Sequence, residues 1–191
     1  MTFEKKTRKI SERSIENAAL FYLQRFATSA ENLKRVLMRR VRRCARAQGP
    51  DETDRTLENG AAIVSGVIDR LIQAGLLDDD KYAEGRAATL HRRGLSSEFI
   101  RRRLTLKGVS ADAAERGLEA LAAGTPGVDL AGAINLARRR RLGPFRPTCD
   151  RAAMRAKDLA TLARAGFGYG IAVQVIDAAV AEDLIEMIGP T

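Results

Sequence analysis

Tryptophan is absent from this 191-residue chain, and aromatic residues together make up only 5% of it. Sites that stack nucleic-acid bases need exposed aromatic rings, so this scarcity argues against base-stacking or sequence-specific recognition. Cysteine is also scarce: Cys44 and Cys149 lie far apart and form no CxxC pair. Two such cysteines are too few for a zinc site, and we expect both to be ordinary reduced residues in packing or surface positions.

Long apolar runs are missing as well. No stretch approaches the roughly 20 consecutive apolar residues of a membrane span. The basic N-terminal tail at residues 1–13 is followed by no apolar segment of the secretory kind. We therefore expect a cytoplasmic protein that has no contact with a membrane.

Side chains that commonly carry catalysis or bind cofactors are few. The one histidine, His91, is expected to be a solvated residue that interacts favourably with a helix C-terminus. Asp78, Asp79 and Asp80 precede a predicted helix, where aspartates usually cap amides, and a hard-cation site needs more oxygen ligands. The glycines of GFGYG at 166–170 follow no strand, which argues against a phosphate loop. We expect no enzymatic activity, no cofactor and no metal.

Helix-forming residues are what the chain has in abundance. Hydrophobic residues make up 45% of it and recur every three to four positions almost throughout, which predicts an all-α fold. Phe26 and Phe167 are expected at core positions. Thr28 and Glu31 match a capping box ahead of the second helix, and a loop is expected at residues 49–59. The last predicted helix runs without a break to about Met187.

The chain also repeats itself. LTLKGVSADAAERGL at 104–118 and LARAGFGYGIAVQVI at 162–176 each place a helix, a glycine stop, an apolar residue and a returning helix at the same intervals. Such stacked modules bury faces that one module cannot bury alone. The predicted organisation is a tail at 1–13, a three-helix repeat at 14–77 with the loop at 49–59, a second repeat at 78–123, a linker at 124–127, and a third repeat at 128–188.

Charge follows the repeat. The net formal charge is +9, and basic blocks of +7, +6 and +7 alternate with acidic blocks of −6, −3 and −4. A surplus of this size favours polyanions or acidic protein surfaces, and guanidinium groups suit phosphates and carboxylates. Any one block alone is compatible with a solvated face. The candidate partner- or DNA-binding residues are Arg35, Arg39, Arg42 and Arg43; Arg92, Arg93, Arg101, Arg102, Arg103 and Lys107; and Arg138, Arg139, Arg140 and Arg141.

The four consecutive arginines at 138–141 end a predicted helix. Successive helical residues point about 100° apart, so all four cannot touch one partner. We expect about two of them to face outward and the others to lay their aliphatic stems along the core.

Several segments resemble the RecX family of regulatory proteins. VIDRLIQAGLLDDDKYAEGRA at 67–87 resembles the most diagnostic stretch of that family, a helix, an aliphatic-Gly-Leu-Leu-Asp-Asp turn and a helix that opens on an aromatic-Ala pair. IRRRLTLKGVS at 100–110 resembles its Leu-x-x-Lys-Gly element, and ARRRRLGPF at 137–145 and LATLARAGFGYGIAVQVI at 159–176 resemble third-module segments. The resemblance covers residues 14–180, and the loop at 49–59 departs from the family pattern.

This resemblance implies a fold and a function. The fold would be an elongated, slightly curved array of three tandem three-helix repeats. The function would be non-enzymatic control of the bacterial recombinase RecA, in which a monomer lies in the groove of the RecA–single-stranded DNA filament. Binding there would restrain ATP hydrolysis, strand exchange and self-cleavage of the SOS repressor, with non-specific contacts to the DNA backbone.

The charge alone supports a different hypothesis, a stand-alone helical DNA- or RNA-binding protein that needs no recombinase. Residues 97–121 superficially resemble a helix-turn-helix unit. A purely structural helical scaffold is a third possibility. Binding to bare DNA, measured with and without RecA, separates the first two.

Overall fold

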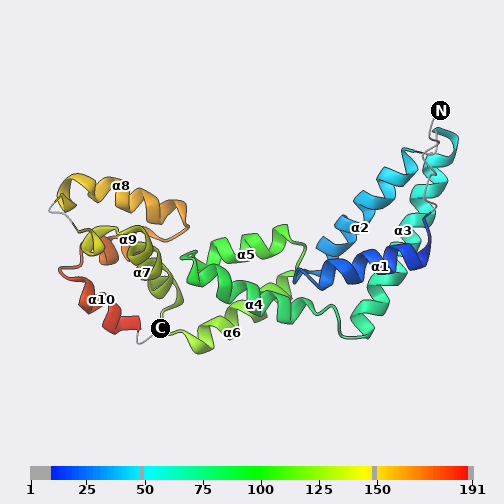
Figure 1. Ribbon diagram of the computed structural model, residues 1–191. Coiled ribbons are helices and arrows are strands. Elements are labelled where there is room, and N and C mark those ends of the chain that lie inside the picture. Colours follow the sequence, from blue (N-terminus) through cyan, green and yellow to red (C-terminus); the bar gives the residue numbers. More distant parts are fainter. Residues whose placement is uncertain (1–9, 48–49, 148–149, 189–191) are drawn as a thin grey trace. The chain divides into compact units, whose positions relative to one another are not determined.

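The fold is described from a computed structural model that places residues 10–47, 50–147 and 150–188 (Figure 1). Within these ranges the chain is all-helical, as the sequence predicts, with ten α-helices, one short 3₁₀ turn and no strand. None of the helices in these ranges has the length and apolar character that crossing a bilayer requires. Cys44 is half-buried and forms no disulfide, whereas Cys149 and most of the predicted N-terminal tail lie outside the described residues.

The chain forms two compact units. The first contains the chain as far as Tyr82 together with Lys107–Val109, and the second contains Ala83–Leu106 and the chain from Ser110 onward. The predicted division into repeats at 14–77, 78–123 and 128–188 follows other boundaries and stays a prediction.

Three helices build the first unit: α1 (Glu12–Leu23), α2 (Ala30–Ala45) and α3 (Pro50–Gln73). Ile15, Leu33 and Leu37 are almost fully buried between them. The cap of α2 is Ser29, whose hydroxyl accepts a hydrogen bond from the Asn32 amide at 3.2 Å. The capping box predicted one residue earlier, at Thr28, is therefore wrong.

The loop predicted at 49–59 is a second correction, because residues 50–59 form the first part of α3. The segment is rich in acidic and polar residues, which are common in loops. Residues 53, 56 and 57 are nevertheless partly buried and Gly60 is buried, which is the spacing of one helix face. At Gly60 a Cβ atom would lie 2.4 Å from Val41 Cγ1, so the glycine marks close packing of α3 on α2.

The prediction that Phe26 lies in the core is also wrong, because its side chain is 51% exposed. Helix α1 ends at Leu23, so Phe26 lies in the segment that follows and cannot continue the apolar face of the helix. It packs instead against Tyr22, with ring centroids 5.1 Å apart. Phe167, in contrast, is buried as predicted.

The second unit contains α4 (Asp79–Arg92) from Ala83 onward and the remaining elements. These are α5 (Ser97–Leu106), α6 (Ala111–Gly124), α7 (Val128–Arg140), the 3₁₀ turn η1 (Gly143–Phe145), α8 (Arg151–Arg164), α9 (Tyr169–Ile176) and α10 (Ala181–Ile188). Ile134, Leu162 and Val175 are fully buried where α7, α8 and α9 pack together.

The single last helix predicted to reach Met187 is instead two helices, α9 and α10, separated at residues 177–180. The guanidinium of Arg151 donates hydrogen bonds to the carbonyl oxygens of Ala178 at 2.5 Å and Ala179 at 3.0 Å. The side chain of Arg151 thus satisfies the hydrogen bonds that these carbonyls would otherwise need from the next turn of a continuing helix. The break depends on Arg151, the first residue of α8, which lies 27 positions before Ala178 and which helical periodicity therefore does not reveal.

Two glycines with left-handed backbone differ in their surroundings, which gives a stability prediction. A Cβ at Gly94 (φ +77°) would lie 2.5 Å from Leu136 Cβ and 2.8 Å from its Cα, whereas at Gly75 (φ +68°) nothing lies within 4 Å. We expect Gly94→Ala to lower the free energy of unfolding by about 3 kcal/mol, the sum of backbone strain and overpacking. Gly75→Ala should cost only about 1 kcal/mol.

Urea unfolding of both variants, followed by circular dichroism, measures the difference. Equal losses would show that α7 moves away from Gly94 without cost and would contradict the prediction.

Candidate functional site

The first predicted basic face lies on α2. Arg35, Arg39, Arg42 and Arg43 are all exposed. Arg35 is engaged within its own helix, where its Nε donates to Glu31 at 3.0 Å. Arg39 and Arg43 join Arg40, which the sequence did not single out, along the edge of an open groove.

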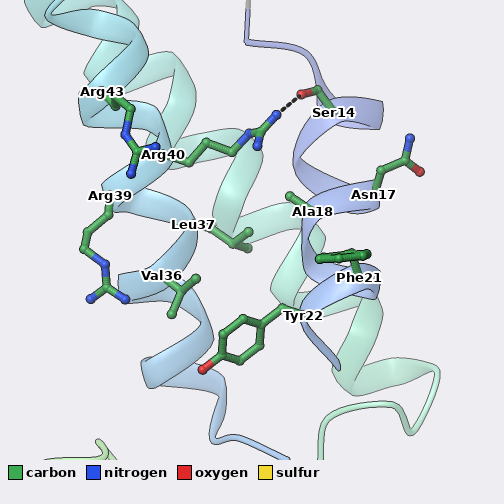
Figure 2. A pocket seen from close by; sticks show the side chains of 10 residues that line it. All are labelled: Ser14, Asn17, Ala18, Phe21, Tyr22, Val36, Leu37, Arg39, Arg40 and Arg43. Atoms are coloured by element: carbon green, nitrogen blue, oxygen red, sulfur yellow. Dashed lines mark hydrogen bonds between the residues drawn. The ribbon is translucent and has the colours of Figure 1, made fainter. Parts of the chain in front are cut away.

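This α1–α2 groove has a volume of about 890 Å³ and lies between the two helices (Figure 2). Its apolar part consists of Ala18, Phe21, Tyr22, Val36 and Leu37, and Ser14 and Asn17 complete its α1 side. Arg40 reaches from α2 to α1, where it donates to the Ser14 hydroxyl at 3.4 Å (Figure 2).

The second predicted cluster is divided by ion pairs. Arg101 binds Glu98 at 2.6 Å and Glu115 at 2.5 Å, and Arg102 binds Glu98 at 2.8 Å. The hydrogen bond from Arg101 lowers the pKa of Glu115, and those from Arg102 and Arg101 lower the pKa of Glu98. Both carboxylates therefore stay ionised at pH values below the ordinary glutamate pKa. They compete with any bound anion for Arg101 and Arg102.

Lys107 does not extend this cluster. It belongs to the first unit, where its ammonium donates to Asn32 Oδ1 at 3.5 Å and its carbonyl accepts a hydrogen bond from the Ser29 hydroxyl. Lys107 is thus tied to the start of α2. Arg92 is exposed and lies near Thr89 of its own helix, with its Nη2 at 3.5 Å from the threonine hydroxyl.

Two arginines of the second predicted cluster and two of the third meet Arg164 in a cleft of the second unit. We define the arginine cleft by the five arginines that line it: Arg93, Arg103, Arg139, Arg140 and Arg164. Its volume is about 310 Å³, and Gly94, Leu95, Phe99, Leu136, Thr161 and Ala165 complete its lining. Among the residues that the structure describes, none of these five arginines forms an ion pair. The cleft therefore concentrates uncompensated positive charge from α5, α7, α8 and the turn that follows α4.

Buried polar contacts hold the elements around this cleft. The Ser97 amide and hydroxyl donate to Asp129 Oδ1 at 2.7 and 2.8 Å, which joins the start of α5 to α7. The Ser96 amide donates to the Ala165 carbonyl at 3.2 Å, which joins α5 to the end of α8. These bonds link segments that are far apart in the chain.

His91 belongs to the same scaffold, so the prediction of a solvated histidine is wrong. Its side chain is 5% exposed, and its Nε2 lies 2.8 Å from the Val128 carbonyl. Gly132 leaves room for the ring, because a Cβ there would lie 3.2 Å from His91 Cδ2. His91 lies in the last turn of α4, where a solvated side chain is expected, but its ring packs against α7 instead.

The four arginines at 138–141 all face water, so the expectation that some lie along the core is also wrong. Helix α7 ends at Arg140, and Arg141 takes a left-handed backbone with φ of +55°. The chain then turns so that Leu142 enters the core in place of an arginine stem. Arg139 and Arg140 line the arginine cleft, and Arg138 and Arg141 are not among its lining residues.

Arg164 is the cleft residue that the sequence did not indicate. It stands alone at the end of α8, outside any arginine run, and donates to the Thr161 hydroxyl at 3.1 Å. Only its position just before Gly166, which matches that of Leu106 before Gly108 in the internal repeat, could have drawn attention to it.

Of the aspartates at 78–80, Asp78 and Asp79 act as caps, as predicted. Asp78 Oδ1 accepts from the amides of Asp80 at 3.1 Å and Lys81 at 3.0 Å. The backbone hydrogen bond from Lys81 is the main cause of the lowered pKa of Asp78. Asp79 Oδ1 accepts from the Ala30 amide at 2.8 Å, so it also caps the start of α2.

Comparison with known proteins agrees with this helical architecture. A family model described as the second three-helix domain of RecX matches residues 78–118. Regulatory protein RecX of Myxococcus xanthus is 41% identical over 175 residues, which cover 91% of this chain and 89% of that protein. Regulatory protein RecX of Agrobacterium fabrum is 28% identical over 160 residues, with 84% and 80% covered.

Two crystal structures share the fold. RecX from Lactobacillus salivarius superposes with a TM-score of 0.55 at 21% identity, over 91% of this chain and 97% of that one. Another regulatory protein RecX gives a TM-score of 0.56 at 20% identity, over 87% and 72%.

Proposed function

The chain belongs to the RecX family of regulatory proteins, and we propose that it regulates the recombinase RecA. In this proposal it binds the RecA–single-stranded DNA filament and inhibits ATP hydrolysis, strand exchange and the co-protease activity that controls the SOS response. It acts as a cytoplasmic monomer and needs neither catalysis nor a cofactor of its own.

The observation that carries the proposal is the arginine cleft. Guanidinium groups bind phosphate oxygens in a bidentate manner, and five of them converge here with no carboxylate among the described lining residues. The cleft thus fits the backbone of a single strand. Phe99 offers little to a base, because it is half-buried and the Arg102 guanidinium lies 5.6 Å from its ring centroid. Binding should therefore be salt-sensitive and largely independent of sequence.

The DNA-dependent ATPase of RecA tests the proposed function. We expect the rate of ATP hydrolysis to fall as this protein is added at substoichiometric and then equal ratios to RecA. The assay is run at low salt, where contacts to phosphate are strongest. No change in the rate under these conditions would refute the proposal.

A stand-alone DNA-binding protein is the second candidate, since the arginine cleft needs no recombinase to attract phosphate. A gel-shift assay on bare DNA separates the two candidates. Tight, sequence-selective binding without RecA would favour the stand-alone function, whereas weak binding that disappears with salt would favour the filament regulator.

A further inference from the structure

The α1–α2 groove combines exposed apolar surface with a row of positive charge. Phe21 is 62% exposed, although Leu37 beneath the groove is almost fully buried in the core. Ala18 lies beside Phe21 on α1, Val36 lies across the groove on α2, and Tyr22 points from α1 toward α2 (Figure 2). Exposed apolar surface of this kind, bordered by polar residues, is typical of an interaction site.

The charge around the groove is of one sign. Arg39, Arg40 and Arg43 line its α2 side, and the described residues that line it include no carboxylate. Just after α1, the guanidinium of Arg25 lies 5.8 Å from the ring centroid of Phe21. A complementary partner must therefore present apolar side chains and carboxylates together.

We propose that the α1–α2 groove binds an acidic amphipathic helix of the RecA filament, an inference that rests on the proposed function. A helix in a groove places apolar side chains on the floor and charged ones on the rim. Aromatic residues and arginine are the side chains that most often dominate such interfaces. A groove of about 890 Å³ has room for several inserted side chains.

DNA fits this groove less well than a protein segment does. Phosphates would satisfy the arginines, but the sugar–phosphate backbone would leave the apolar floor without a partner. Arg25 already lies near the Phe21 ring and restricts stacking by a base. In this proposal the groove binds a protein segment and the arginine cleft binds phosphate.

The variant Phe21→Ala tests this division. We expect about a tenfold higher concentration for half-maximal inhibition of the RecA ATPase, because an interface aromatic is truncated. Affinity for bare single-stranded DNA should stay within twofold of wild type. Ile72→Ala is the control, since Ile72 is also an exposed apolar residue of the first unit, on α3, and does not line this groove. It should leave both measurements unchanged.

Two results of this assay overturn the inference. If the wild-type chain inhibits RecA and Phe21→Ala inhibits it equally well, the groove is not the contact and the proposed function stands. If the wild-type chain has no effect on RecA, the proposed function and the inference fail together.

Photocrosslinking identifies the occupant directly. The photoreactive analogue p-benzoylphenylalanine replaces Phe21, and the protein is irradiated on RecA filaments assembled on single-stranded DNA. A covalent adduct with the RecA polypeptide supports the inference. An adduct with DNA alone, an adduct with a second copy of this chain, or no adduct at all while inhibition is intact would overturn it.

Discussion

Replacing Arg103 and Arg139 together by glutamate is expected to weaken binding to bare single-stranded DNA by several hundredfold. Both side chains line the arginine cleft, on α5 and α7. Each phosphate contact adds about 0.7 to the slope of log affinity against log salt for a single strand, or about fivefold in affinity at 0.1 M salt. Replacing both arginines by alanine should therefore weaken DNA affinity about 25-fold. Glutamate reverses each charge and should roughly double the loss in the logarithm of affinity, which gives about 600-fold.

The matched control is the pair Arg92→Glu and Arg138→Glu. These arginines lie in the last turns of α4 and α7 but are not among the residues that line the cleft. The control changes net charge by the same amount, so a general electrostatic effect would act on both pairs. Fluorescence anisotropy with a labelled oligonucleotide across a salt series gives affinity and slope together. Equal losses in the two pairs would indicate diffuse attraction and argue against a defined cleft.

The cleft variants should also separate DNA binding from partner binding. If the groove and the cleft act independently, Arg103→Ala with Arg139→Ala reduces the DNA salt slope by about 1.4. Phe21→Ala should leave that slope at the wild-type value. The two surfaces lie in different compact units of the chain.

Replacing Asp158 by alanine is expected to lower the free energy of unfolding by about 3–5 kcal/mol. Its carboxylate is 4% exposed and accepts hydrogen bonds from Arg146 Nη2 at 2.7 and 3.0 Å and from the Gly143 amide at 2.9 Å. Truncation leaves the Arg146 guanidinium, itself only 20% exposed, without its counter-charge. Removing one partner of a buried pair costs more than the pair contributes, because the remaining charge is desolvated.

An exposed pair in the same unit is the control. Arg155 and Asp177 form two hydrogen bonds at 2.6 and 2.7 Å, but their side chains are 43% and 39% exposed. Water screens this pair, so Asp177→Ala should change stability little. Urea unfolding compares the two alanine variants, and similar losses would show that burial of Asp158 is not the deciding factor.

Two further variants separate charge from hydrogen bonding at this site. Asp158→Asn keeps an acceptor for the Gly143 amide and loses the charge, so an intermediate loss is expected. Combining Asp158→Leu with Arg146→Met removes both charges and should recover much of the stability that Asp158→Ala loses. Failure of the double variant to recover would mean that the Gly143 hydrogen bond dominates.

The helical character of the chain was predictable from its residues. Apolar positions such as Leu33, Leu37 and Val41 recur at helical spacing and are buried together. The predicted cap at Asp78 also holds, because a cap bonds amides two or three residues away. Such signals are local, and a single sequence contains them.

The errors arose where distant contacts outweigh local composition. Polar residues around 50–59 suggested a loop, but packing of Gly60 on Val41 keeps them in α3. His91 looked solvated at a helix end, but the Val128 carbonyl lies within hydrogen-bonding distance of its ring. In each case the deciding partner is on another helix.

The sequence by itself determined an all-helical chain with basic blocks in register with an internal repeat. Only the tertiary structure decided which arginines act together. Glu98 and Glu115 neutralise Arg101 and Arg102, while Arg93 and Arg164, which are 71 positions apart in the sequence, share one cleft. Helical periodicity is set by neighbours three to four residues away, whereas a charged cleft is set by packing between helices, which no local pattern encodes.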